Sequence, residues 1–235
     1  MPEAWMPRVG AMPTEFTVRG SHTAFQRPER GTAQVTLAFE GPAMQPVYDR
    51  VVRDLEAVKT SIQALHDPEH GPVTWWSTQH VRTWAQRPWN QSGKQLPLVH
   101  HASVGVQVKF RDFGVLATWV GQHVAATQGF RLDGVVWALT ESNRHDLERA
   151  VRTRAVQAAV RRAQEYAEAL GLGPVRPVAV ADAGMLSTGI APVGGGSAPF
   201  MRMAAAKDAG GGAELELAPE DIEVSAEIDA RFVAE

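Results

Sequence analysis

Residues 141–170 read ESNRHDLERAVRTRAVQAAVRRAQEYAEAL and predict the longest helix of the chain. The stretch contains no glycine or proline, Ser142 can cap its start, and Gly171 suits the left-handed position that ends a helix. Alanines recur along it every three to five residues, at positions 150, 155, 158, 159, 163 and 167. Because small residues let a helix backbone approach a sheet closely, we expect Ala158 and Ala159 at or beside a sheet-facing side.

On both sides of this helix, the apolar pattern alternates between the strand period of two and the helix period of 3.6. It predicts two further helices, at residues 44–65 and 113–124. It predicts strands at residues 16–19, 33–40, 73–85, 103–110, 134–139, 175–181 and 222–232. The order is ββα, ββα and βαβ, followed by a C-terminal strand. Strands that can pair as hairpins, mixed with helical crossovers, predict an α+β fold with a mixed or antiparallel sheet and three main helices.

Several details of these elements are specific. The strands at residues 73–85 and 103–110 can form one long hairpin, and the short apolar run at residues 134–139 suits a strand covered on both faces. The first helix has a stripe of apolar residues for burial: Met44, Tyr48, Val51, Leu55, Val58, Ile62 and Leu65. In the second helix the corresponding residues are Phe113, Leu116, Val120 and Val124, with Asp112 as the N-terminal cap.

The pattern predicts one folded domain over residues 14–235, preceded by a flexible lead-in at residues 1–13. Within the domain, a Gly/Ala-rich excursion at about residues 182–218 contains GGGS, MAAAK and GGGA. It also carries apolar residues, among them Met185, Leu186 and Phe200. Two interpretations stay open: a mobile contact surface that takes part in assembly, or a tolerated insertion with a few residues on the core.

The composition argues against several functions. A formal net charge of −3 gives no overall basic field of the kind that attracts nucleic acid. The absence of cysteine excludes disulfides, thiolate metal sites and cysteine nucleophiles. No stretch approaches the ~18 uninterrupted apolar residues of a membrane span. Residues 1–16 lack the apolar run of a signal peptide, so we expect a cytoplasmic protein.

Two histidine groups are candidates for a metal site. In HDPEH, His66 and His70 flank Asp67 and Glu69, and imidazole and carboxylate are both metal ligands. Pro68 breaks the helix between the histidines, however, so a polar loop is the favoured interpretation. His100 and His101 are neighbours on a predicted strand and must point to opposite faces, which prevents both from binding one metal ion without distortion. We therefore predict no metal site.

The aromatic strand at residues 73–85 is the best candidate for a ligand site. His80 and Arg82 can share a strand face with Trp76 and Trp84, and such a face can stack a ring-bearing ligand. Packing of the aromatic rings on one another is the simpler interpretation.

Nucleotide and hydrolase motifs are missing. The arginines of residues 141–170 are spread around the helix among acidic residues, which is typical of a solvated, ion-paired face and not of a phosphate-binding patch. The glycines at 194–196 and 210–212 lack the Lys-Ser/Thr of a P-loop, and no Gly-x-Ser-x-Gly sequence occurs. We predict no catalytic and no cofactor-binding residue.

Several short motifs follow one another along the chain: Val18-Arg19-Gly20, Pro28-Glu29 before TAQVTLAFEG, VGVQVKFRD at 104–112, VVWAL at 135–139, ALGLGPV at 169–175 and PEDIEVSA at 219–226. Their order and spacing resemble the SIMPL domain family, also called DUF541, over about residues 14–234. Pro28-Glu29 stands where the family usually has Pro-Asp, and Gln128-Gly129-Phe130 where it usually has Gly-Ala-Asn.

The family has no established catalytic residues, so the resemblance implies a fold and no site. Some members form large ring-like oligomers, which implies that this chain is a homo-oligomer. We therefore expect a non-enzymatic scaffold or interaction protein that self-associates, with no cofactor and no nucleic-acid partner. The alternative is a small-ligand-binding protein or enzyme that uses the Trp-lined strand at residues 73–85.

Overall fold

The computed structural model describes residues 13–89, 91, 95–186 and 217–235. These residues fold as two compact units. The terminal unit takes the described parts of Met1–Gln26, Glu141–Pro199 and Glu223–Glu235; the central unit takes those of Arg27–Thr140 and Phe200–Ile222. The single domain over residues 14–235 stays a prediction. The flexible lead-in at 1–13, apart from its last residue, and most of the excursion at 182–218 lie outside the described residues.

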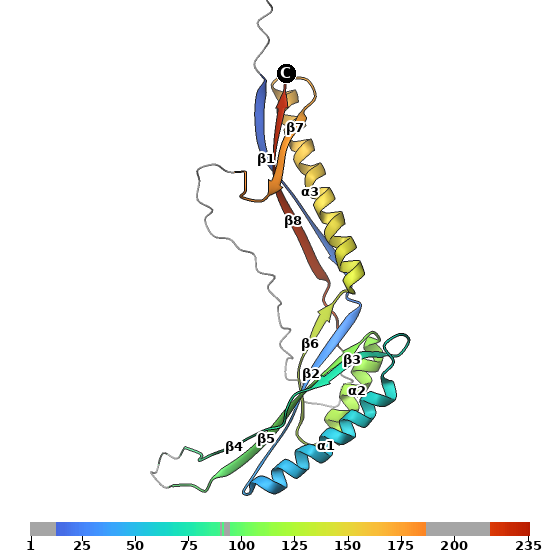
Figure 1. The fold of residues 1–235 in the computed structure, drawn as a ribbon, viewed down its shortest axis with the longest axis vertical. Coiled ribbons are helices and arrows are strands. Elements are labelled where there is room, and N and C mark those ends of the chain that lie inside the picture. The colour runs from blue at the N-terminus through green and yellow to red at the C-terminus, as the bar shows by residue number, and fades with distance from the viewer. Residues whose placement is uncertain (1–12, 90, 92–94, 187–216) are drawn as a thin grey trace, which may run out of the picture. The chain divides into compact units, whose positions relative to one another are not determined.

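The central unit is a five-stranded sheet with two helices on one face (Figure 1). Strand order is β3-β5-β2-β6, and β4 also pairs with β5. The pairs β2/β5, β2/β6, β3/β5 and β4/β5 are all antiparallel. The elements are β2 (Arg30–Gly41), α1 (Met44–Leu65), β3 (Val73–Thr78), β4 (Arg82–Gln86), β5 (Val99–Phe110), α2 (Phe113–Ala126) and β6 (Phe130–Ala138).

The core of this unit forms between the helices and one face of the sheet. Every second residue of β5 from Ala102 to Phe110 is buried, and Val35 of β2 pairs with Val106 in the same layer. In α1 the buried residues are Val47, Val51, Leu55, Val58 and Ile62. The predicted stripe is therefore correct from Val51 to Ile62 but wrong at its start, where Val47 is buried and Tyr48 is 39% exposed.

Two other details were predicted wrongly. In α2, Asp112 caps the helix as expected and accepts a hydrogen bond from Val115 N (3.0 Å). The predicted stripe is wrong at its end, however, because Val124 is 56% exposed and Trp119, which is not in the stripe, is buried. Strand β6 is not covered on both faces, because its residues 134–138 are only half-buried.

The terminal unit is a three-stranded sheet in the order β1-β8-β7, with α3 on one face (Figure 1). Its elements are β1 (Thr14–Gln26), α3 (Glu141–Ala169), β7 (Arg176–Asp182) and β8 (Ile222–Ala234), with β7 antiparallel to β8. The predicted alanine face is confirmed: Ala155, Ala159, Ala163 and Ala167 are buried with Val151, at a spacing of four, and Ala158 is half-buried beside them. The α+β class and the element order are confirmed, with one strand more than predicted.

Candidate functional site

The HDPEH loop is built as a turn. The Asp67 carboxylate accepts hydrogen bonds from the backbone N–H groups of Glu69 (2.9 Å) and His70 (3.1 Å), which lower the pKa of Asp67. Arg111 donates to the carbonyls of Pro68 and Glu69 (3.0 and 2.6 Å) and fixes the loop from the end of β5. No group of three or more potential metal ligands occurs among the described residues.

His100 and His101 lie on opposite faces of β5, because burial along this strand alternates strictly from Ala102 onward. His101 points away from the helices. Its ring stacks on Trp84 with centroids 5.0 Å apart and planes 7° apart, and its Nδ1 lies 3.4 Å from a Glu40 carboxylate oxygen. The histidine pair therefore does not converge on one site.

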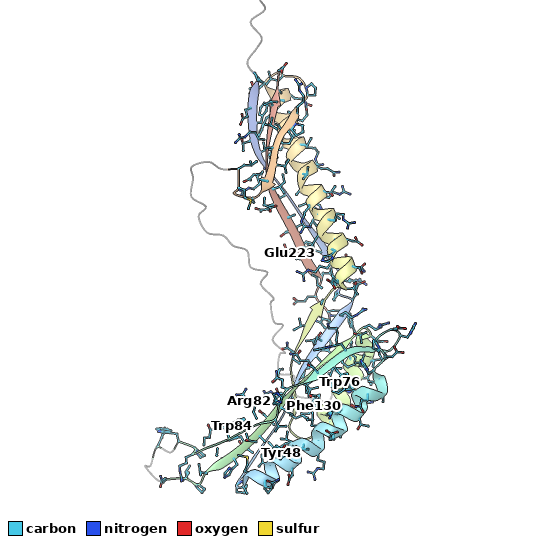
Figure 2. The ribbon with its side chains drawn as sticks, in the orientation of Figure 1. Tyr48, Trp76, Arg82, Trp84, Phe130 and Glu223 are labelled. Carbon is cyan, nitrogen blue, oxygen red and sulfur yellow. The ribbon has the colours of Figure 1, made fainter. Side chains whose placement is uncertain are left out.

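The predicted Trp-lined strand is two strands, and this separates its aromatic residues. A register shift between Val73 and Trp75 turns Trp76 toward the helices, where it packs against the core, while Trp75 points to the outer face. Strand β4 begins only at Arg82, after a break at residues 79–81. Arg82 and Trp84 pair with Ser103 and His101 of β5, so they too lie on the outer face (Figure 2). The expectation that Trp76 shares a face with Arg82 and Trp84 is wrong.

The outer face of the central sheet is the clearest candidate surface. No described element covers it, since α1 and α2 both pack on the opposite face. Trp75 and Trp84 are 43% and 42% exposed on it, and Lys109 lies over the Trp75 ring at 5.3 Å. The face carries both signs of charge, since its ionisable side chains include Lys109, Arg82, Arg131, Asp133 and Glu40.

A polar network between α1 and α2 is not predicted by any sequence pattern. Ser61 Oγ lies 2.8 Å from His123 Nε2 and donates to the Val58 carbonyl at 2.7 Å, and Trp119 Nε1 donates to Ser61 Oγ at 3.0 Å. The other ring nitrogen of His123 faces the Thr127 hydroxyl at 3.4 Å, not a carboxylate. Burial lowers the pKa of His123, because it disfavours the charged ring. A Ser–His pair of this kind can be found only from the packing of two helices.

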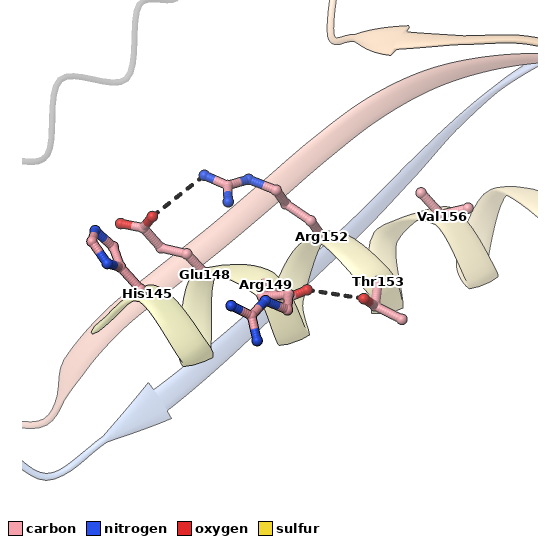
Figure 3. A pocket seen from close by; sticks show the side chains of 6 residues that line it. All are labelled: His145, Glu148, Arg149, Arg152, Thr153 and Val156. Atoms are coloured by element: carbon pink, nitrogen blue, oxygen red, sulfur yellow. Dashed lines mark hydrogen bonds and ion pairs between the residues drawn. The ribbon is translucent and has the colours of Figure 1, made fainter. Parts of the chain in front are cut away.

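In the terminal unit, the arginines of α3 form ion pairs as predicted. Glu148 accepts from Arg144 and Arg152 (3.2 and 3.4 Å), and the hydrogen bond from Arg144 lowers its pKa. Arg149 pairs with Asp146 at 3.4 Å. An open hollow of about 490 Å³ lies beside these ion-paired residues of α3 (Figure 3). It is lined by His145, Glu148, Arg149, Arg152, Thr153 and Val156.

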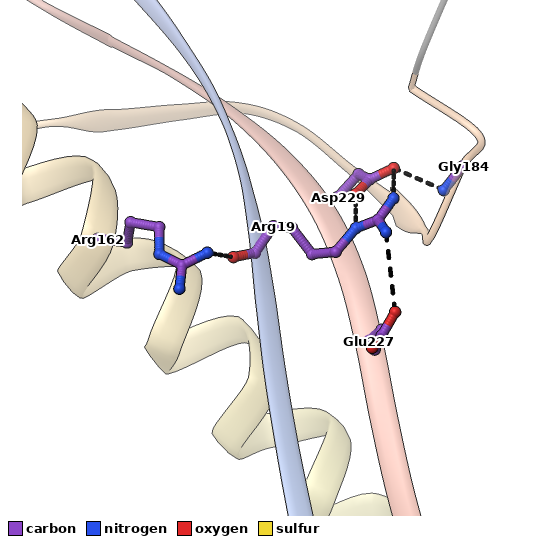
Figure 4. Close-up of polar contacts among 5 residues, drawn as sticks. All are labelled: Arg19, Arg162, Gly184, Glu227 and Asp229. Atoms are coloured by element: carbon purple, nitrogen blue, oxygen red, sulfur yellow. Dashed lines mark hydrogen bonds and ion pairs between the residues drawn. The ribbon is translucent and has the colours of Figure 1, made fainter. Parts of the chain in front are cut away.

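Asp229 is the one buried charged residue among those that the structure describes, at 7% exposure. Its carboxylate accepts from Arg19 Nε (2.8 Å) and from the backbone N–H of Gly184 (2.6 Å), as Figure 4 shows. The hydrogen bond from Arg19 is the main reason that the pKa of Asp229 is lowered. The guanidinium also reaches Glu227 at 3.9 Å.

Three further observations bear on what kind of protein this is. None of the described helices combines the length and apolar character that a membrane span needs. No curated protein matches the chain. The sequence model of the SIMPL family, described as a protein of unknown function (DUF541), matches residues 16–232, which include described elements of both units. The chain therefore belongs to the SIMPL family.

Proposed function

We propose that this SIMPL-family chain is a non-enzymatic interaction protein that self-associates, most simply as a two-fold dimer, through the outer face of its central sheet. The observation that carries this proposal is the exposure of Trp75 and Trp84 on a sheet face that no described element covers. Covering about 100 Å² of each ring is worth roughly 2–3 kcal/mol. Large exposed aromatic side chains grouped on one face are typical of interaction surfaces.

Charge favours a second copy as the occupant. Lys109 lies beside Trp75, and Glu40 lies beside His101 and Trp84. Lys109 lies eight residues along β5 from His101, a distance of roughly 27 Å along the strand. A two-fold axis near the middle of the face would set Lys109 of one copy near Glu40 of the other, twice over, as an isologous interface requires.

The non-enzymatic part of the proposal rests on the contacts that the potentially catalytic side chains make within the protein. Asp67 is engaged in its turn, Asp229 holds Arg19 and Gly184, and the Ser61–His123 pair lies between helices without a carboxylate behind the ring. General acid–base and nucleophilic catalysis need such groups free to reach a substrate. These contacts support a structural role for each group.

Light scattering on the full chain tests the proposal. At about 50 µM we expect a mass at least twice the 25.5 kDa of one chain. Trp75→Ser combined with Trp84→Ser should return the protein to a monomer, because the interface loses both rings. Trp89→Ser is the matched control, since Trp89 is 81% exposed but lies outside the strands. The proposal is contradicted if the unmodified chain has the mass of a monomer, or if the doubly substituted chain still has the mass of a dimer.

A second candidate is small-ligand binding at Arg82 and Trp84, which share the outer face with the stacked His101 ring. An aromatic platform beside a guanidinium can hold a planar, anionic ligand. A thermal-shift screen separates the two functions, because a ligand at 100 times its Kd adds ~2.7 kcal/mol to the free energy of unfolding. Stabilisation that is lost in Trp84→Ser and kept in Trp89→Ser would favour the ligand site.

A further inference from the structure

Strand β8 is much longer than its neighbour β7. The seven residues of β7 pair with β8 only from Ile228 to Val233. On that side, residues 223–227 of β8 have no partner strand among the described residues. Unpaired backbone N–H and C=O groups along a strand edge are a template for another strand.

The end of β7 is fixed by the buried Asp229. Beyond Asp182 the chain turns, with Gly184 in the left-handed region (φ 87°) and its N–H bonded to the Asp229 carboxylate at 2.6 Å (Figure 4). Met185 N donates back to the Asp182 carbonyl at 3.1 Å and closes the turn. This contact therefore ends β7 at Asp182, and among the described residues it leaves the edge at 223–227 without a partner strand.

Two contacts of α3 show which of its sides faces this edge. Arg162 Nη1 donates to the Arg19 carbonyl of β1 (2.8 Å), whereas Gln164 Oε1 accepts from the N–H of Val175, the residue before β7 (3.0 Å). Gln164 thus marks the β7 side of the helix. Val160 and Val156 precede it at a spacing of four and lie on that side as well.

The hollow of about 490 Å³ continues the same side toward the start of the helix, because Val156 is one of its lining residues (Figure 3). Gly173, just after α3, donates to the Glu235 carbonyl at 2.8 Å, so α3 and β8 end together. Figure 1 shows the two elements running side by side in the same direction. The first half of α3 therefore lies alongside residues 223–227 of β8. The hollow lies on the β7 side of this half of α3, and all the residues that line it come from α3.

The side chains on the two faces of β8 at residues 223–227 define which added strand would fit beside it. Val224 and Ala226 of β8 are half-buried on the helix side. Glu223 and Glu227 are exposed on the other side, where the Arg19 guanidinium lies 3.9 Å from Glu227. The arginines beside the hollow already have partners in Glu148 and Asp146, so the helix side offers mainly the aliphatic parts of its side chains and Val156.

We propose that residues 223–227 of β8 bind an extended segment of a partner protein as an added strand, with apolar side chains toward α3 and basic side chains beside Glu223 and Glu227. Main-chain hydrogen bonds supply the affinity and alternate side chains the specificity. A second copy of β8 is a poor occupant, because antiparallel pairing about Ser225 would set Glu223 opposite Glu227 and like charges opposite each other destabilise a pair. This surface and partner are distinct from the self-association face.

The probe is a soluble seven-residue peptide of alternating Lys and Val, capped at both ends, added to the full chain. Hydrogen exchange is read at residues 223–227. We expect fast exchange in the free protein at the amides that face the gap, and at least tenfold slowing when the peptide is bound. The same peptide carrying N-methyl groups on alternate residues should not bind. Protection of these amides before the peptide is added, which would place another strand of this chain in the gap, overturns the proposal.

Charge is tested separately. In Glu223→Lys, we expect the affinity for the Lys-Val peptide to fall about two- to fivefold and the affinity for a Glu-Val peptide of the same length to rise. Glu165→Lys is the matched control, an equal charge change at an exposed position of α3 away from the gap. Absence of peptide binding, or binding that tolerates N-methylation, would also overturn the proposal.

Discussion

Gly20 of β1 lies directly against Ala159 of α3. A Cβ atom at Gly20 would come within 2.7 Å of the Ala159 backbone nitrogen and 2.8 Å of the Ala159 Cβ, and it would also meet the Ala155 carbonyl oxygen. These neighbours are mainly backbone atoms of a helix, which cannot rotate away. The last position of the Val-x-Gly motif therefore sets how closely strand and helix approach.

Gly20→Ala should destabilise the terminal unit by about 1–3 kcal/mol or more, because the strand and the helix must separate. The measurement is urea unfolding followed by circular dichroism. Gly121→Ala in α2 is the matched control, since a Cβ there meets nothing within 4 Å and alanine favours a helix. Equal stability of the Gly20→Ala variant and the unmodified chain would show that the contact is looser than the structure has it.

The alanine face makes a graded prediction. Ala159 is fully buried and Ala158 only half-buried, so Ala159→Leu should cost about 1–3 kcal/mol and Ala158→Leu clearly less. Thermal unfolding of the two variants side by side gives the comparison. A larger loss at position 158 than at 159 would contradict the orientation of α3.

Acid should weaken the terminal unit through Asp229. The pKa of Asp229 is lowered by its hydrogen bond from Arg19, so the carboxylate stabilises the fold above its unfolded pKa of about 3.9. That stability is lost as the pH falls from about 4 through the lower folded pKa. Asp229→Asn should lower the free energy of unfolding at pH 7 and flatten its dependence on pH below about 4. Unfolding curves at several acidic pH values test this, and an unchanged pH profile in the variant would contradict it.

His123 should also weaken the fold on acidification, at milder pH and because its neutral form is the one that burial favours. Burial lowers its pKa below the usual value of about 6.5. As the pH falls below about 6.5, the unfolded chain takes up a proton that the folded chain resists, so the free energy of unfolding declines until the folded pKa is passed. His123→Gln should remove this decline, whereas His70→Gln, at an exposed side chain, should keep it. Urea titrations between about pH 7.5 and 5.5 supply the measurement.

Regular periodicity explains what could be predicted. The alternation of β5 from Ala102 to Phe110 and the alanine spacing of α3 each repeat over several turns or pairs, so a single buried face accounts for them. The element order and the polar nature of the HDPEH loop followed from the same patterns and from Pro68.

Irregular backbone explains what could not be predicted. The break at residues 79–81 adds one residue between β3 and β4 relative to β5 and sends Trp84 to the opposite face from Trp76, which no alternation pattern can encode. At the start of α1, Val47 and Tyr48 are both apolar, and only packing decides that Val47 is buried. Ser61 and His123 meet through tertiary packing alone, since 62 positions separate them.

The pairing of β1 with β8 governs the order in which the chain can fold during synthesis. Arg19 and Asp229, bonded side chain to side chain, are 210 positions apart, and the whole central unit is translated between them. The central unit draws its sheet and both helices from one continuous segment and can close first. Until β8 emerges, β1 has only α3 to cover it, and the edge of β1 that pairs with β8 stays open to other nascent chains.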